Sequence, residues 1–190
     1  MSSQADVYLS PEEYLSIERR SETRSEYLNG EVFAMVGASR EHNLIVANIT
    51  GELRQQLKGR PCELYPNDMR VKIPATGLYT YPDVVVVCGE PLFEDEHVDT
   101  LLNPTLIVEV LSESTESYDR GKKFGHYQTV GSLAEYLLVA QDEARIEQFV
   151  KRPDAHWLYS DTRSADGFLE LSSIGCVLAL KEVYDKVALP

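Results

Sequence analysis

The spacing of apolar residues predicts two helices in the first third of the chain. The sequence Ser-Pro-Glu-Glu that begins at Ser10 is typical of a capped helix start, so we expect a helix from there to about Arg19. Between residues 39 and 58 apolar side chains recur every three or four positions. This spacing predicts a long amphipathic helix that ends before Gly59.

Short apolar stretches between turn residues predict the strands. Asn29-Gly30 is the signature of a tight hairpin turn, whose second strand should run from Glu31 to Met35. The continuous β-branched runs Val84–Cys88 and Thr105–Leu111 are typical of central strands that are covered on both faces. Further strands are expected at 63–65, 69–73 and 135–139, and alternating stretches at 145–150, 157–160 and 168–171 predict a meander.

Two more helices complete the predicted order of elements. One should run from about Asp119 to Gln128, and a short terminal helix is expected at 181–187. Without internal repeats or a linker, residues 1–190 are expected to form a single domain. The predicted class is α/β: a mixed β-sheet core flanked by helices, with an added antiparallel C-terminal β meander.

Composition narrows the functional classes. The chain has 31 acidic and 18 basic residues, a net charge of −13, which argues against passive attraction to nucleic acid or an anionic membrane. No apolar run reaches the roughly 18 residues of a spanning helix, and residues 1–6 lack the pattern of a signal peptide. We therefore expect a cytoplasmic protein without a membrane partner. Cys62, Cys88 and Cys176 are expected to be buried thiols.

The negative charge is distributed unevenly. Residues 90–119 contain nine acidic residues and no Lys or Arg, whereas residues 40–72 contain six basic and four acidic residues, a local balance of +2. The acidity thus lies in and around the segment between the two most apolar strands. There we expect part of it to attract a cation, so a phosphate-bearing partner is not excluded.

Glu109 is the most informative single residue. Alternate residues of a strand share a face, so Glu109 lies with Ile107 and Leu111 on an apolar surface. A buried carboxylate without a partner costs several kcal/mol, so it requires a cation, a hydrogen-bonding network or a proton. The alternative is a strand-end glutamate that faces solvent or pairs with an arginine.

Asp83 occupies a comparable place at the start of the other apolar strand. It follows Tyr81-Pro82, and proline is tolerated at the entry of a strand. Taken alone, Pro-Asp is also a common turn dipeptide. If the two strands are neighbours, Asp83 and Glu109 converge at one edge of the sheet. Two close carboxylates then favour a hard divalent cation, Mg²⁺ or Mn²⁺, between them.

A third motif follows the Glu109 strand. On a helix Asp119, Lys123 and Tyr127 share one face, because they are four residues apart. That face could return across the carboxylate edge and place Lys123 near a developing anion. The alternative is an ordinary salt bridge between Asp119 and Lys123 on a solvated face.

Together these pieces resemble the PD-(D/E)xK nuclease superfamily and, more closely, its bacterial Uma-type family of restriction endonucleases. The resemblance covers most of the chain. It is carried by Glu26-Tyr27-Leu28-Asn29-Gly30-Glu31, Met35, His42, Tyr81-Pro82-Asp83-Val84, Pro104, Ile107-Val108-Glu109-Val110-Leu111-Ser112, Asp119-Arg120-Gly121-Lys122-Lys123, Tyr127 and Glu135-Tyr136-Leu137-Leu138-Val139.

The resemblance implies a restriction-endonuclease-like fold and hydrolysis of DNA by a Mg²⁺-dependent site. Asp83, Glu109 and the backbone carbonyl of Val110 would hold the metal. The superfamily's basic residue usually stands two places after the glutamate, where this chain has Leu111, so the lysine looks relocated to Lys123. Lys122 is the second choice for this lysine.

Glu31, or else Glu26 or His42, could complete the site, and a homodimer would suit cleavage of both DNA strands. Two other functions remain open. One is an inactive module of the same fold that binds nucleic acid or protein. The other is an enzyme that acts on a small phosphorylated substrate.

Overall fold

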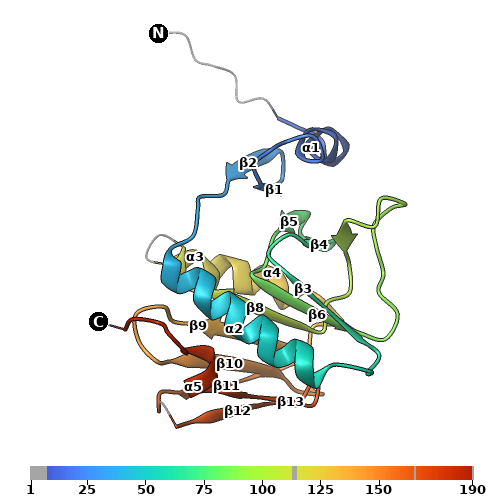
Figure 1. Ribbon diagram of the computed structural model, residues 1–190. Helices are drawn as coiled ribbons and strands as arrows, with labels where there is room; N and C mark the ends of the chain where they lie inside the picture. The colour runs from blue at the N-terminus through green and yellow to red at the C-terminus, as the bar shows by residue number, and fades with distance from the viewer. Residues whose placement is uncertain (1–7, 113–114, 165, 190) are drawn as a thin grey trace.

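A six-stranded mixed sheet lies at the centre of the computed structural model, which describes residues 8–112, 115–164 and 166–189 (Figure 1). The strand order is β11-β10-β9-β8-β6-β3, in which β8 and β9 are parallel and all other neighbours are antiparallel. The strands are β3 (Cys62–Pro66), β6 (Val84–Cys88), β8 (Leu106–Val110), β9 (Glu135–Val139), β10 (Ile146–Lys151) and β11 (Trp157–Thr162).

Two smaller sheets accompany the central one. A five-stranded sheet has the order β2-β1-β5-β4-β7, with only β4 and β7 parallel, and β12 pairs with β13 in a separate hairpin. Their bounds are β1 (Ser25–Leu28), β2 (Glu31–Ala34), β4 (Arg70–Ile73), β5 (Leu78–Thr80), β7 (Thr100–Leu101), β12 (Phe168–Leu171) and β13 (Cys176–Ala179).

The two predicted N-terminal helices are present. Helix α1 (Pro11–Glu18) begins with a capping box, in which the Ser10 hydroxyl accepts from the Glu13 N–H and the Glu13 carboxylate accepts from the Ser10 N–H. Ser39 caps α2 (Arg40–Gln56) in a similar way. The short α5 (Leu180–Val183) overlaps the first part of the terminal helix predicted at 181–187.

The predicted helix at 119–128 is built differently from the expectation. It consists of α3 (Glu116–Tyr118), a π-helical turn η1 (Asp119–Lys123) and α4 (Phe124–Tyr127). Single π-turns inside helices are rare and occur frequently at functional sites. The apolar periodicity could indicate a helix here but not this local widening.

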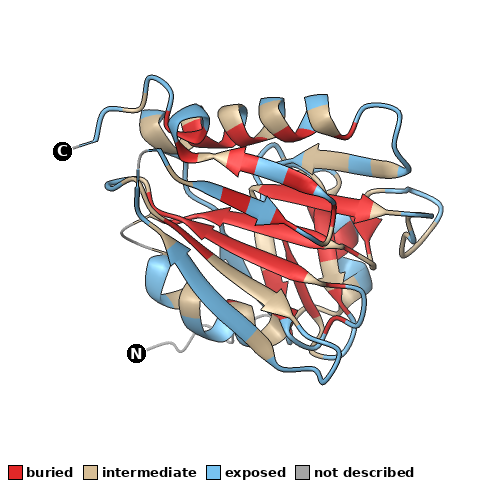
Figure 2. Cartoon of the chain, turned by 90° about the horizontal axis from the view of Figure 1, so that it is seen from below, coloured by how far each residue is buried: buried red, intermediate tan, exposed pale blue. Residues whose placement is uncertain are grey.

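Apolar side chains fill both faces of the central sheet, where buried residues are concentrated (Figure 2). On one face, Ile45, Ile49 and Leu53 of α2 pack against strand residues such as Val108, together with the β12–β13 hairpin. On the other face, side chains that include Ile107 pack against α4 and the five-stranded sheet. The continuous apolar runs in β6 and β8 therefore reflect burial on both faces, as predicted.

The fold class is confirmed, and the predicted hairpin turn has both Asn29 (φ 49°) and Gly30 (φ 94°) in the left-handed region. Most of the predicted meander extends the central sheet as β10 and β11, whereas β12 pairs apart from it. The short strands β5, β7 and β13 were not predicted, because two to four residues give too little periodicity. None of the described helices is long and apolar enough to cross a membrane.

The expectation of three free thiols is wrong for two of them. Cys62 and Cys88 form a disulfide, whereas Cys176 is buried and free. The antiparallel register of β3 and β6 places Cys62 directly opposite Cys88, and their separation of 26 residues gave no sign of this pairing. Residues 1–6, where we predict no signal peptide, lie outside the described residues.

Candidate active site

The pairing of β6 with β8 brings the two predicted acidic residues together. Val84 lies opposite Val108, so the same register places Asp83 opposite Glu109. The N–H of Val110 donates a hydrogen bond to Oδ2 of Asp83 at 2.7 Å. Directly opposite residues of an antiparallel pair point to the same face. The prediction that these carboxylates converge at one edge is therefore met by the strand register.

Lys123 lies in the π-turn and reaches the same place. Its Nζ is 3.0 Å from Oε1 of Glu109, 3.1 Å from Oε1 of Glu26 and 3.5 Å from Oδ1 of Asp119. Lys123 is 6% exposed, whereas its neighbour Lys122 is exposed to solvent. We call Glu26, Asp83, Glu109, Asp119 and Lys123 the Lys123 cluster.

The helix face predicted from spacing is buried, not solvated. Asp119 and Tyr127 flank Lys123, and the Tyr127 hydroxyl donates to Oε1 of Glu109 at 2.7 Å. The hydroxyl of Thr80 in β5 donates to Glu26. The cluster is thus enclosed by the central sheet, the 116–127 helical segment and the five-stranded sheet.

The charges of the cluster shift the pKa values of its members. Burial raises the pKa of Glu109, which the Lys123 ammonium opposes and the carboxylates of Asp119 and Asp83 increase further. Burial would lower the pKa of Lys123, but Glu109, Glu26 and Asp119 outweigh it and hold that pKa well above its usual range. The ammonium therefore stays charged, with more carboxylates around it than one positive charge can balance.

The donor chemistry of this cluster fits a hard divalent cation. Asp83 and Glu109 supply carboxylate oxygens at neighbouring positions, and these are the ligands that Mg²⁺ and Mn²⁺ prefer. In the described part of the chain, no group of three or more His, Cys, Asp or Glu side chains is arranged to hold a metal ion. The third ligand predicted from the resemblance is the backbone carbonyl of Val110, which follows Glu109 in β8.

His42 belongs to the site more directly than its sequence position indicated. It lies in the first turn of α2, and its Nε2 is 3.2 Å from Oδ2 of Asp83. Its other ring nitrogen, Nδ1, is buried without a hydrogen-bond partner among the described residues. Asp83 is therefore held from two sides, by the Val110 N–H and by the His42 ring.

Of the two glutamates that flank the hairpin turn, Glu26 and not Glu31 lies in the Lys123 cluster. Glu31 is exposed beside the hairpin turn and forms no described ion pair with Lys123, whereas Glu26 lies within β1 and contacts Lys123 directly. Sequence spacing could not separate the two, since both flank the same turn.

Comparison with known proteins gives the family. The family Uma2, described as "Putative restriction endonuclease", matches residues 11–180. The chain belongs to the Uma2 family. Two proteins of Synechocystis sp. (strain ATCC 27184 / PCC 6803 / Kazusa) are similar over most of their length: "Uncharacterized protein slr1290" is 39% identical, covering 95% of this chain and 93% of its own, and "Uncharacterized protein sll1609" is 37% identical, covering 86% and 93%.

A solved structure of a similar fold supports the nuclease-like architecture of this Uma2 protein. It is titled "Crystal structure of a putative nuclease belonging to DUF820 from Anabaena variabilis ATCC 29413". The two structures superimpose with a TM-score of 0.78 over 95% of this chain and 99% of the other, at 17% identity. This likeness shows that the two proteins share a fold.

A pocket of about 600 Å³ in the Uma2 chain is lined partly by sequence neighbours of the Lys123 cluster. It lies at the C-terminal ends of the parallel strands β8 and β9 and at the start of α2. Ligands of open α/β sheets bind at such ends. Its lining residues are Ser39, Glu41, Leu111, Ser112, Glu116, Arg120, Ala140, Gln141, Asp142, Glu143 and Arg145.

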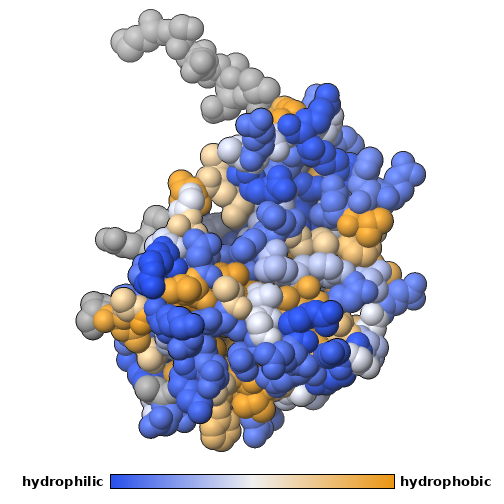
Figure 3. All heavy atoms as spheres, viewed as in Figure 1, coloured by the Kyte–Doolittle hydropathy of each residue, from blue (hydrophilic) through white to orange (hydrophobic). Residues whose placement is uncertain are grey.

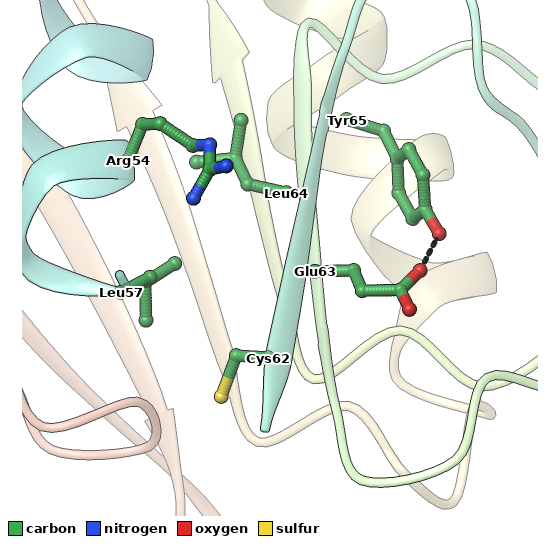
Figure 4. Close-up of a pocket in the computed structure, with 6 residues that line it drawn as sticks. All are labelled: Arg54, Leu57, Cys62, Glu63, Leu64 and Tyr65. Atoms are coloured by element: carbon green, nitrogen blue, oxygen red, sulfur yellow. Dashed lines mark hydrogen bonds between the residues drawn. The ribbon is translucent and has the colours of Figure 1, made fainter. Parts of the chain in front are cut away.

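A second pocket, of about 260 Å³, lies between the C-terminal end of α2 and the edge strand β3 (Figure 4). Arg54 and Leu57 approach it from the helix, and the hydroxyl of Tyr65 donates to Glu63. No member of the Lys123 cluster lines this pocket. It is separate from the candidate chemistry.

Several acids of the segment 90–119, part of which is expected to attract a cation, pair with basic side chains of this chain. Asp95 and Asp99 bind Arg19, the C-cap residue of α1, each at 2.7 Å, and Asp99 also lies 3.0 Å from Arg70. Glu94 binds Lys72. These acids are neutralised by basic residues from elsewhere in the fold, and Glu109 and Asp119 are the acids of this segment that join the Lys123 cluster.

Proposed function

We propose that this protein is a metal-dependent endonuclease that hydrolyses phosphodiester bonds of DNA at the Lys123 cluster. The observation that carries the proposal is the position of Lys123, whose ammonium lies 3.0 Å from Glu109 on the strand that pairs with the Asp83 strand. A hydrolytic phosphate site needs both acidic groups for a cation and a positive charge for the phosphate. Membership of the Uma2 family supports the same chemistry.

Asp83 and Glu109 would hold Mg²⁺ or Mn²⁺, with the carbonyl of Val110 as the third protein ligand. When bound, the cation supplies a polarised phosphate and an activated water. The hydrogen bond from the Val110 N–H and the close approach of the His42 ring keep Oδ2 of Asp83 in place. The residues around the cation are thus positioned before DNA arrives.

Lys123 would bind the scissile phosphate and stabilise the negative charge that develops on it. Its raised pKa keeps the amine protonated at neutral pH, as this role requires. Tyr127 donates to Glu109 and fixes the carboxylate against the helix. Glu26 and Asp119 hold the ammonium from the other sides and limit its movement.

Cleavage of duplex DNA by the purified protein, with Mg²⁺, Mn²⁺ or EDTA, tests this proposal. We expect cleavage with either cation, none with EDTA, and at least about a 100-fold loss in Asp83→Asn, since electrostatic groups of this kind contribute that much. Asp161→Asn is the matched control, because it removes a carboxylate from β11 at the far edge of the same sheet. Equal cleavage by Asp83→Asn would reveal a contaminating nuclease.

The alternative is a nuclease-fold module that binds DNA or protein without cleaving it. The three carboxylates that already surround the Lys123 ammonium favour this alternative, since they could form a self-contained structural network. Calorimetric titration with Mg²⁺ and Mn²⁺ separates the two functions. An absence of cation binding, together with DNA binding that persists in EDTA, would support the module.

A further inference from the structure

Arg24 is an exposed arginine near the Asp83 end of the Lys123 cluster. It directly precedes β1, two residues before Glu26, and its carbonyl accepts a hydrogen bond from the Met35 N–H at 3.0 Å. This bond extends the β1–β2 ladder by one step. Alternate residues of an extended chain share a face. Arg24 therefore lies on the same side of the chain as Glu26, which contacts Lys123.

Two contacts hold the Arg24 side chain near Asp83. Its guanidinium carbon lies 5.7 Å from the centre of the ring of Tyr81, which stands two residues before Asp83. Its Nε lies 3.6 Å from Oδ1 of Asp68. The neighbouring Asn67 N–H donates to the Asp83 carbonyl at 2.9 Å. The ring and this turn therefore place the guanidinium beside the strand end that carries Asp83.

The pairing of Arg24 with Asp68 leaves hydrogen-bonding capacity of the guanidinium unused. A separation of 3.6 Å is longer than a hydrogen bond, and the two side chains are 42% and 77% exposed. Exposed pairs of this kind contribute little stability. Arg19, in contrast, binds two carboxylates at 2.7 Å each. Arg24 can therefore exchange Asp68 for a stronger acceptor.

A phosphate group of DNA is the acceptor that fits this position. A guanidinium binds phosphate through two parallel N–H donors. A chain with a net charge of −13 repels DNA overall, so the DNA backbone needs cationic side chains where it passes the site. Hydrophilic side chains dominate the upper part of the face seen in Figure 3, around α1, which suits a charged partner better than an apolar one.

We propose that Arg24 binds a DNA phosphate close to the one that is cleaved at Lys123. Two residues of a strand span about 7 Å. One strand of DNA rises about 3.4 Å per nucleotide, so the step from Glu26 to Arg24 matches about one or two nucleotides. In the absence of DNA, Asp68 pairs with the guanidinium, and the phosphate replaces it. This role rests on the proposed function, because it takes DNA as the ligand of the Lys123 cluster.

Binding of fluorescently labelled duplex DNA, followed by anisotropy in EDTA over a series of salt concentrations, tests this role. The logarithm of the binding constant should fall linearly with the logarithm of the salt concentration. Arg24→Gln should reduce this slope by about 0.9, the value for one lost phosphate contact. At the lowest salt concentration its affinity should be at least about 10-fold below that of the wild type. Arg24→Lys keeps the charge and should retain the wild-type slope.

Arg163→Gln is the matched control, because Arg163 is also exposed and pairs with a carboxylate, that of Asp161. It follows β11, an edge strand of the central sheet, so its slope and affinity should equal those of the wild type. Asp68→Asn separates DNA binding from a structural role of the ion pair. It frees Arg24 and should raise DNA affinity, whereas loss of a purely structural pair gives no such gain.

Three results would overturn the proposal: a wild type that does not bind DNA, a wild-type slope in Arg24→Gln, or an equal loss in Arg163→Gln. If circular dichroism shows that Arg24→Gln is unfolded, Asp68→Asn decides alone, and an affinity no higher than that of the wild type rejects the role of Arg24. EDTA prevents metal-dependent cleavage, so binding alone is measured. A protein that cleaves DNA but keeps its slope in Arg24→Gln contradicts only this inference. One that binds DNA through Arg24 without cleaving it contradicts only the proposed function.

Discussion

Two buried glutamates on adjacent parallel strands differ in their partners. Glu109 in β8 is 4% exposed, and Glu135 in β9 is fully buried. Burial raises the pKa of both side chains. Glu135 accepts hydrogen bonds from neutral donors, namely the N–H and hydroxyl of Ser173 and the amide of Gln148.

Glu109 accepts from one neutral donor, the Tyr127 hydroxyl, and also meets charged groups. Its carboxylate contacts the Lys123 ammonium, and the carboxylates of Asp119 and Asp83 raise its pKa further. Neutral donors are sufficient to bury a carboxylate, as Glu135 demonstrates. The additional acids around Glu109 are therefore an electrostatic cost that stability does not explain. This difference, more than burial or the direction of the pKa shift, supports the proposal that Glu109 is a functional residue.

The largest effect is expected from removal of the ammonium at the Glu109 site. Lys123→Met leaves three carboxylates without their shared cation, so the free energy of unfolding should fall by about 3–5 kcal/mol. Mg²⁺ should restore part of this loss if the carboxylates bind it. Urea denaturation with and without Mg²⁺ measures both quantities.

Lys72→Met is the control for that substitution, because Lys72 binds the single carboxylate of Glu94 at a partly exposed position. A loss within about 1 kcal/mol is expected there. If Lys123→Met is no less stable than Lys72→Met, the ammonium is not needed to keep the acids of the Lys123 cluster buried. Glu109 would then not differ from Glu135 in its need for a charged partner.

Substitution of His42, which contacts Asp83, is expected to have an intermediate effect on DNA cleavage. His42→Ala removes the ring 3.2 Å from Asp83 and should lower DNA cleavage about 10- to 100-fold, as loss of ligand-orienting partners does. His42→Gln should retain most activity, because its amide N–H can approach Oδ2 of Asp83 in place of Nε2. Calorimetry should show weaker binding of Mg²⁺ by His42→Ala alone.

His126→Ala provides the control for this experiment, since His126 lies in α4 and forms no described contact with Asp83. Equal losses in His42→Gln and His42→Ala would mean that the imidazole itself is required. Donation to Asp83 would then be the wrong role for His42.

The smallest effect concerns pH. Arg19 lowers the pKa of Asp99, so this pair stabilises the protein above the usual Asp pKa of about 3.9 and loses its effect as the pH falls. Burial raises the pKa of Glu135, so its contribution is greatest below the usual Glu pKa of about 4.3 and declines as the pH rises.

Denaturant unfolding of Asp99→Asn and Glu135→Gln across a pH series measures these opposite trends. The deficit of Asp99→Asn relative to the wild type, about 1 kcal/mol at neutral pH, should vanish in acid. The deficit of Glu135→Gln should increase in acid. Parallel trends in the two variants would contradict the assigned pKa directions.

The sequence was most informative where the signals were local. The capping box at Ser10, the Asn29-Gly30 turn and the apolar runs of β6 and β8 each act within a few residues, and all are present in the fold. Glu109 was found because a charge in an apolar strand requires a partner.

Other features depend on strand pairing and packing between distant segments, which a short stretch of sequence does not specify. The Cys62–Cys88 disulfide follows from the pairing of β3 with β6, and the choice of Glu26 over Glu31 follows from how the hairpin lies against the helix. The π-turn that carries Lys123 is set by packing and not by spacing. The neutralisation of the acidic segment likewise required Arg19 and Arg70, which are distant in sequence.

The most direct test of the central claim compares Glu109→Gln with Glu135→Gln in one experiment. Cleavage of duplex DNA with Mg²⁺ and the free energy of unfolding are both measured for each variant. We predict that Glu109→Gln loses at least about 100-fold in cleavage without a loss of stability. We predict that Glu135→Gln loses about 1–2 kcal/mol of stability and cleaves as the wild type does. Cleavage by Glu109→Gln at the wild-type rate would contradict the assignment of Glu109 to the active site.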